Sequence, residues 1–247
     1  MESKFKLPTE LVELPSKGFL YSEDSPLASG ALEMKYMTAK EEDILTNQNY
    51  IKNGTVIDKL LQSLIVDKSI KLNELLIGDK NAIMIAARVL AYGKDYTVTF
   101  AGEKVTVDLS KLENKVLDET LYNDRKNEFK FSLPHTDNQI TFRLLTHADE
   151  KNIEREIEGR KKLKKDSSTQ VTTRLSYIIT SVNGLAEQKD VREFVNDYLL
   201  AKDSRALREY YNKVSPDIDI QHTYTNDAGR EEEFDIPIGI DFFWPDL

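Results

Sequence analysis

The chain has 247 residues, a formal net charge of −9 at pH 7, 40% hydrophobic residues and no cysteine. This length holds one large or two small domains, and the lack of cysteine excludes disulfides and thiolate metal sites. A negative chain lacks the basic face that neutralises nucleic-acid phosphates, so we expect no nucleic-acid partner. No apolar run approaches the roughly 18 residues of a membrane helix, and residues 1–6 do not resemble a signal peptide. We therefore expect no membrane partner and a cytoplasmic location.

Residues 1–30 are expected to form an extended N-terminal arm. Proline and glycine interrupt this segment too often for a helix. Its apolar residues are nevertheless too many for a free tail: Leu11, Val12, Leu14, Phe19, Leu20, Tyr21 and Leu27. The arm is expected to lie in a groove, which either this chain or another subunit could provide.

The next stretch predicts a strand that leads directly into a helix. Leu32, Met34 and Tyr36 alternate with charged residues, as in a half-buried strand. Thr38 is a predicted N-cap, and Glu41 three residues later completes a capping box. The first helix is predicted to run from Thr38 to Gln48.

Two further helices and a hairpin are predicted to complete a first half, residues 31–110. Gly54–Val66 has amphipathic spacing. Asp79 is expected to cap a helix from Lys80 to Tyr92, whose interior is apolar on nearly all sides and therefore buried. A hairpin follows, with predicted strands Tyr96–Phe100 and Val105–Leu109.

Residues 111–138 are predicted to connect this half to a second one. Leu112, Val116, Leu117 and Leu121 suggest a short helix. Phe129–Leu133 alternates like a strand and is expected to pair with Gln139–Leu145.

The remaining residues, 139–247, repeat the order of the first half. Ile140–Leu145 alternates, and Thr146 precedes an acidic helical turn as Thr38 does. Val171–Val182 corresponds to Gly54–Val66, and a second hairpin is predicted from His222–Thr225 and Glu233–Ile238. We infer an internal duplication; the alternative is two unrelated segments that share common capping chemistry. The predicted fold is α+β and mostly helical, with two related halves of strand, capped helix, further helices and hairpin.

Three features of the second half suggest surfaces. The helix after Thr146 is highly charged and has few apolar positions, so it is expected to project or pack lightly. Its basic end is either a solvated helix terminus, a phosphate site or a partner-binding surface: Arg160, Lys161, Lys162, Lys164 and Lys165. Helices are then predicted over Lys189–Leu200 and from Ser204 to Val214, with Asp203 or Ser204 as a cap. The aromatic tail Phe242–Trp244 is either packed or a docking peptide.

Catalytic patterns are weak. The three histidines are far apart in sequence, and no P-loop, G-x-G-x-x-G or G-x-S-x-G motif occurs. One acidic group has strand context and carboxylates that suit Mg²⁺ or Ca²⁺: Asp217, Asp219, Asp227 and Asp235. A metal-dependent hydrolase is thus one alternative, although no known ligand spacing supports it.

Several motifs, in order, resemble a known family. They are Leu14-Pro15-Ser16-Lys17-Gly18-Phe19-Leu20-Tyr21, Met37–Leu45, Gly78-Asp79-Lys80 before a helix with Arg88, Tyr92-Gly93, Ser215-Pro216-Asp217 and Ile236–Pro245. Together they resemble the T4-type bacteriophage baseplate protein family, whose members are associated with assembly of the tail baseplate hub. The resemblance spans nearly the whole chain.

The resemblance implies a non-enzymatic protein that assembles the baseplate hub in the host cytoplasm, with other hub or tail assembly proteins as partners. The alternative is a permanent structural subunit of the virion baseplate. Relatives often carry Cys-x-x-Cys pairs in the two hairpins, like zinc-ribbon knuckles, and this chain has none, so we expect no zinc and no other cofactor. We expect partners to bind at Leu11, Leu14, Phe19, Leu20, Tyr21, Arg160, Lys161, Lys164, Phe242, Phe243 and Trp244.

Overall fold

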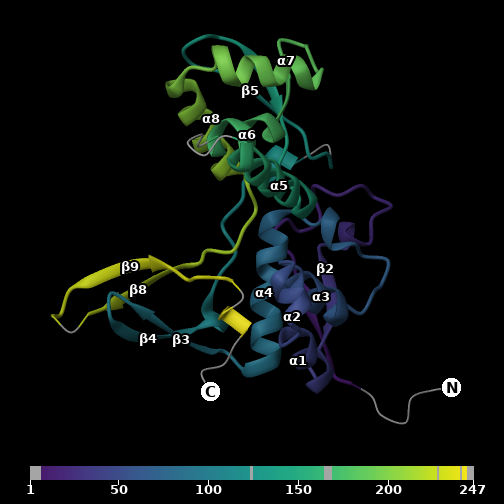
Figure 1. The fold of residues 1–247 in the computed structure, drawn as a ribbon, viewed down its shortest axis with the longest axis vertical. Helices are drawn as coiled ribbons and strands as arrows, with labels where there is room; N and C mark the ends of the chain where they lie inside the picture. The colour runs from purple at the N-terminus through teal and green to yellow at the C-terminus, as the bar shows by residue number, and fades with distance from the viewer. Residues whose placement is uncertain (1–6, 123–124, 164–168, 227, 240, 244–247) are drawn as a thin grey trace.

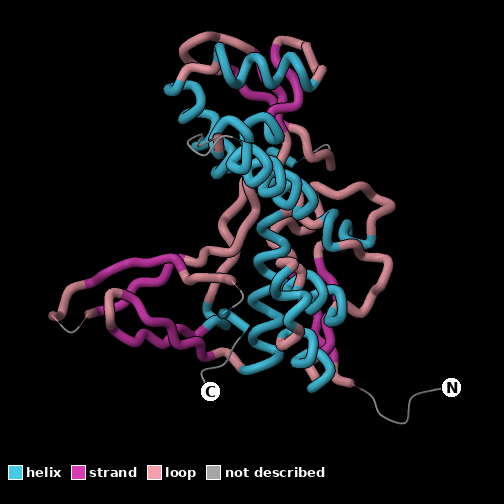
Figure 2. Tube along the Cα trace, viewed as in Figure 1, coloured by secondary structure: helices cyan, strands magenta, loops and turns pink. Residues whose placement is uncertain are grey.

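The computed structural model describes residues 7–122, 125–163, 169–226, 228–239 and 241–243. Figure 1 shows three parts. A first body (residues 7–92) lies at the lower right, and a second body (residues 129–214) lies at the top. A hairpin arm projects sideways from the first body and contains strands from the middle of the chain and from near its C-terminus. Helices dominate both bodies, whereas the arm is almost entirely strand and loop (Figure 2).

The first body is a two-stranded hairpin packed with helices. Its elements are β1 (Thr9–Glu13), a 3₁₀ turn (Pro26–Ser29), β2 (Ala31–Lys35), α1 (Ala39–Leu45), α2 (Gln48–Lys52), α3 (Val56–Leu64), a second 3₁₀ turn (Leu72–Glu74) and α4 (Ile77–Tyr92). β1 and β2 are antiparallel, with Leu11 opposite Glu33. The N-terminal arm therefore forms part of its own body, since β1 supplies a strand and Leu14 and Leu27 are fully buried.

The predicted junction of strand and helix is confirmed. Leu32 and Met34 are buried on one face of β2. The Glu41 carboxylate accepts hydrogen bonds from the Thr38 backbone N–H (3.0 Å) and hydroxyl (2.6 Å). The same carboxylate binds Lys35 Nζ at 2.7 Å, which ties the end of β2 to the first turn of α1.

The second body is a three-stranded antiparallel sheet covered by helices. Its elements are β5 (Phe129–Ser132), β6 (Gln139–Phe142), α5 (His147–Leu163), α6 (Gln170–Ile178), β7 (Ile179–Val182), α7 (Gln188–Glu193), a π-helical turn (Phe194–Tyr198) and α8 (Ala201–Val214). The strand order is β5-β6-β7. β5 lies in the segment predicted to connect the halves, and it pairs with β6 as expected.

Two predicted helices of this body are wrong at their ends. The helix expected over Val171–Val182 ends at Ile178, and its last four residues form β7. Ile179 is extended (φ −75°, ψ 127°) because the run Ile-Thr-Ser-Val pairs with β6, and branched side chains favour a strand. The helix expected to end at Leu200 stops as a π-helical turn at Tyr198.

Asp79 and Asp203 do not cap their helices. α4 begins at Ile77 and α8 at Ala201, so both aspartates lie in the first helical turn rather than before it. Both side chains are fully buried. Their carboxylates serve loops from elsewhere in the chain, as described below.

The connector is extended, so the short helix predicted from Leu112 to Leu121 is wrong. 3₁₀ turns occur only at its two ends, at Leu109–Lys111 and Glu119–Tyr122. Between them the chain runs antiparallel to the segment that leaves α8. Lys115 N donates to Asp217 O (2.9 Å), and Asp219 N donates to Glu113 O (2.8 Å). This pair of segments joins the second body to the hairpin arm. Val116 is 99% exposed, so this apolar residue does not face a core as the predicted helix required.

The hairpin arm combines strands from distant parts of the sequence. β3 (Asp95–Phe100) pairs with β4 (Glu103–Asp108), and β8 (Gln221–Thr225) pairs with β9 (Glu231–Asp235). β9 ends at Asp235, three residues before the predicted end of this strand at Ile238. Each hairpin is its own two-stranded sheet, and aromatic rings join them: the Phe100 and Phe234 rings stack with centroids 4.6 Å apart.

The end of the described chain packs against the hairpin arm. Phe242 and Phe243 are buried within a 3₁₀ turn (Asp241–Phe243), and the Phe242 ring meets Tyr96 edge-on at 4.9 Å. Of the two expectations for the tail, packing is confirmed for these two residues, and Trp244 lies outside the described residues. In the described part of the chain, no helix is long and apolar enough to span a bilayer.

Candidate functional site

Most apolar side chains predicted to bind partners are enclosed by this chain. Leu14, Leu20, Tyr21, Phe242 and Phe243 are at most 8% exposed. The folded chain thus covers these five side chains itself, because the arm and the tail fill the protein's own core, where large apolar groups are most stable. Their role in partner binding stays a prediction.

Leu11 and Phe19 retain exposed surface. Leu11 is 70% exposed on β1, an edge strand. Phe19 is half-buried and stacks on Tyr122 with ring centroids 6.3 Å apart. Among the described apolar residues of the predicted set, Leu11 is thus the one that a partner can reach most directly.

The basic end of α5 is partly neutralised. Arg160 binds Glu156 at 2.7 Å, and Arg192 of α7 binds the same carboxylate through two bonds of 2.8 Å. Arg192 lowers the pKa of Glu156 to about 2, with a contribution from Arg160. Lys161 is exposed, and Lys164 lies outside the described residues. Arg160 is therefore partly a structural residue, whereas Lys161 is open to a partner.

Asp79 anchors the loop between β1 and β2. Its carboxylate accepts from Ser16 N (2.9 Å), Ser16 Oγ (2.7 Å) and Tyr21 Oη (2.6 Å). Tyr21 Oη in turn accepts from Leu76 N (2.9 Å) at the start of α4. Burial raises the pKa of Asp79 and of Tyr21. The network fixes the loop onto the first turn of α4.

Asp203 anchors the loop between β5 and β6 from the equivalent turn of α8. Its carboxylate accepts from His135 N (2.9 Å) and Thr136 Oγ1 (2.8 Å), and it contacts His135 Nδ1 at 3.0 Å. Burial opposes ionisation, but the hydrogen bonds from Thr136 and His135 outweigh it and lower the pKa of Asp203. A Leu-Pro pair precedes the bound residue in both loops, and a Leu-Leu pair precedes both helices. That repeated spacing is a sequence pattern from which both anchors could have been predicted.

A charge cluster joins the two bodies. Asp58 of α3 contacts His147 Nε2 at 2.7 Å and forms an ion pair with Lys151, both on α5. Lys80 of α4 lies 3.9 Å from Asp58 and 3.1 Å from His147 Nδ1. Burial opposes the charge of Asp58, yet hydrogen bonds from His147 and Lys151 lower its pKa to about 2. α5, which was expected to project or pack lightly, is thus fixed at its N-terminal end.

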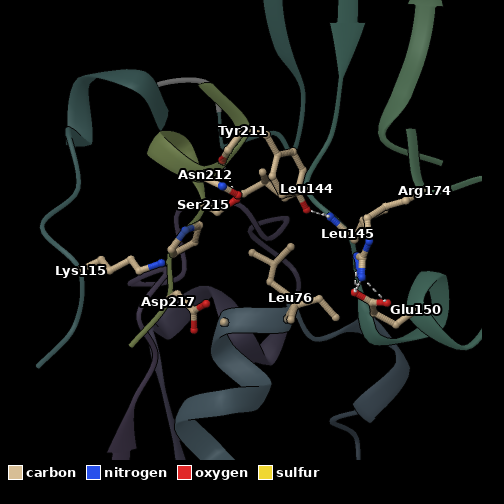
Figure 3. A pocket seen from close by; sticks show the side chains of 13 residues that line it. Leu76, Lys115, Leu144, Leu145, Glu150, Arg174, Tyr211, Asn212, Ser215 and Asp217 are labelled. Carbon is tan, nitrogen blue, oxygen red and sulfur yellow. Dashed lines mark hydrogen bonds and ion pairs between the residues drawn. The ribbon is translucent and has the colours of Figure 1, made fainter. Parts of the chain in front are cut away.

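A cavity of about 250 Å³ lies at the same junction (Figure 3). Arg174 forms an ion pair with Glu150 at 2.6 Å, and nearby Leu145 N donates to Tyr211 Oη at 3.1 Å. Gly78 also lines the cavity, and it lies so close to the end of α8 that an added Cβ would meet the Pro216 carbonyl oxygen at 1.9 Å. This close backbone approach makes a tight joint between α4 and the end of α8.

The carboxylates proposed as metal ligands make separate contacts with other residues. Asp217 accepts from Asn81 Nδ2 (3.1 Å), and Asp219 accepts from Gln221 N (3.1 Å). Asp235 pairs with Gln221 across the hairpin, and Asp227 lies outside the described residues. Among the described residues, no three histidine or carboxylate groups gather as metal ligands.

An exposed apolar group on the second body was not predicted. Leu185 is 58% exposed and Tyr198 is 61% exposed, and both line a cavity of about 240 Å³ with the half-buried Phe194. We call Leu185, Phe194 and Tyr198 the outer patch. Sequence periodicity did not reveal it because a turn and a π-helical segment bring its members together.

Comparison with known proteins supports one family. The family model described as T4 bacteriophage base plate protein matches residues 12–244. No curated protein and no solved structure matches the chain significantly. Because the match covers nearly the whole chain, the protein belongs to the T4 bacteriophage base plate protein family.

Proposed function

We propose that this protein is a non-enzymatic assembly factor that binds components of the tail baseplate hub while the hub is built in the host cytoplasm. Family membership supports a baseplate role. The observation that carries the finer proposal is that exposed apolar groups lie on both bodies, which a tight junction holds together. Leu11 lies on the first body and the outer patch on the second, so one chain can hold two partners in a fixed relation.

We also propose that the two bodies arose by duplication. Two correspondences support this: the Thr38–Glu41 capping box matches Thr146–Asp149, and Asp79 matches Asp203 as a loop anchor. In each copy a basic residue at the end of the strand, Lys35 or Arg143, binds the acidic residue of the capping box. The two hairpins pack on each other: the β8–β9 hairpin, which follows the second body, contacts the β3–β4 hairpin, which follows the first body.

The duplicated plan suggests a mechanism of templating. Each body presents an edge strand, β1 or β7, beside an exposed apolar residue, Leu11 or Leu185. Edge strands and exposed apolar groups are common sites of protein association. The Asp58 cluster and the connector hold the two bodies in register, so that hub components bound to each would meet in one orientation.

Phage carrying a stop codon in this gene provide the test. We expect their lysates to contain hub components that do not enter baseplates, and we expect the purified protein added to such lysates to restore hub formation. A matched preparation with Leu11→Ser and Leu185→Ser should fold normally and fail to restore it. Complete baseplates in the stop-codon lysates would contradict the proposal.

A further inference from the structure

Arg88 is a buried cation without a carboxylate partner among the described residues. Its side chain is 6% exposed, and its Nε has no hydrogen-bond partner. One terminal nitrogen makes a long bond of 3.4 Å to the Gly93 carbonyl oxygen. The rings of Tyr92 and Tyr96 lie 4.9 and 5.7 Å from the guanidinium carbon, which gives partial cation–π compensation. A buried guanidinium normally has an anionic partner, because burying an unpaired charge is costly.

Arg88 lines a groove of about 550 Å³ beside β3. Consecutive residues of β3, from Asp95 to Thr99, form one wall, and Pro237, Gly239 and Phe242 form the other. A strand that lines a groove with consecutive residues presents its edge to it, since alternate side chains point to opposite faces. In the described sheets β3 pairs only with β4, so no described strand pairs with the edge that faces this groove.

The charges around the groove restrict what it can hold. Asp95 is paired with Lys94 at 3.2 Å, and Lys104 also lines the groove. Asp241 lines it as well and would repel a densely acidic segment. A segment with a single carboxylate among neutral residues fits this balance best.

We propose that the groove binds an extended segment of a partner polypeptide, which adds to the edge of β3 and places one Asp or Glu carboxylate against Arg88. Strand addition supplies backbone hydrogen bonds, and the guanidinium supplies a charge-assisted bond that selects the acidic side chain. The inference rests on the proposed function, because it assigns the hairpin arm a partner in the hub. It adds a specific recognition rule to that function.

The test uses the full-length chain and blocked strand-forming heptapeptides of Thr and Val that differ only in a central Glu or Gln. Isothermal titration should show the Glu peptide binding at least about tenfold more tightly, as expected for one hydrogen bond to a charged group. Arg88→Met should remove this preference, and Arg88→Lys should keep part of it. Arg205→Met is the matched control, since it removes an exposed cation far from the groove and should preserve the preference.

Two peptide isomers test strand addition directly. N-methyl groups on the amides that face the β3 edge should abolish binding, whereas N-methyl groups on the alternate amides should not. Equal binding of the Glu and Gln peptides, equal binding of both isomers, or no binding up to about 1 mM would each overturn the inference. Such a result would leave the assembly role intact, because restoration of hubs in stop-codon lysates measures that role independently.

Discussion

The carboxylate of Asp79 holds the backbone N–H and hydroxyl of Ser16, 63 residues earlier in the chain, at 2.9 and 2.7 Å. This contact makes the first turn of α4 the attachment point of the β1–β2 loop. The N-terminal arm is ordered as a consequence, since Leu14 and Tyr21 on either side of Ser16 are buried. One buried carboxylate thus fixes a segment rich in proline and glycine onto the first body.

Replacement of Asp79 by alanine should destabilise the protein strongly. The change leaves the Ser16 N–H and the Ser16 and Tyr21 hydroxyls without their acceptor, at a cost of about 3–5 kcal/mol in the free energy of unfolding. Asp203→Ala should cost a similar amount, and the two effects should add, because the two anchors share no partner. Urea unfolding measures both, and Asp43→Ala, an exposed change, should stay within about 0.5 kcal/mol of the parent. A cost below about 1 kcal/mol for Asp79→Ala would contradict the anchoring role.

The two anchors separate the features of the fold that local sequence patterns predict from those that depend on tertiary contacts. Strand alternation at Leu32 and Met34 and the capping residues Thr38 and Thr146 are local patterns, and they were predicted correctly. Asp79 and Asp203 follow the same local rule for a cap, but tertiary hydrogen bonds take their carboxylates, so their helices begin earlier. The Arg88 groove depends on which distant segments meet, and the outer patch depends on a turn and a π-helical segment. Helical or strand periodicity carries no information about either.

Gly78 should not tolerate a side chain. Gly78→Ala places a methyl group 1.9 Å from the Pro216 carbonyl oxygen, so the joint between α4 and the end of α8 must shift, at a cost of about 1–3 kcal/mol. Gly159→Ala is the matched control, because Gly159 lies in α5 with open space around it. That change should stabilise the protein by roughly 0.5–1 kcal/mol through helix propensity. Thermal unfolding of both variants checks the pair, and equal melting temperatures would contradict the tight joint.

Asp58 should make stability depend on pH in acid. Its pKa in the folded chain is about 2, below the ordinary aspartate value of 3.8, so the unfolded chain takes up the proton first as the pH falls. The stability that it contributes is present above about pH 4 and is lost as the pH falls through about 2, a loss of roughly 2 kcal/mol. Urea unfolding at about pH 5.5 and about pH 2.5 should show a smaller loss in Asp58→Asn than in the parent. Identical pH dependence in both proteins would show that the cluster does not hold Asp58 ionised.

The outer patch should matter for assembly and not for folding. Leu185→Ser and Tyr198→Ser change exposed side chains, so the free energy of unfolding should move by less than about 0.5 kcal/mol. Plaque yield in a complementation assay should nevertheless fall, because a contact with a hub component is lost. Val116→Ser is the control, since Val116 is 99% exposed and lies away from the patch. Full complementation by both patch variants would remove the outer patch from the binding surface.

Quantitative mass spectrometry of purified mature particles and infected-cell lysates tests the central claim most directly. The proposal of a transient assembly factor predicts abundant protein in the lysate and none in mature particles. A fixed whole-number ratio to a known tail protein in the particles would contradict it, and would make the chain a permanent subunit of the baseplate.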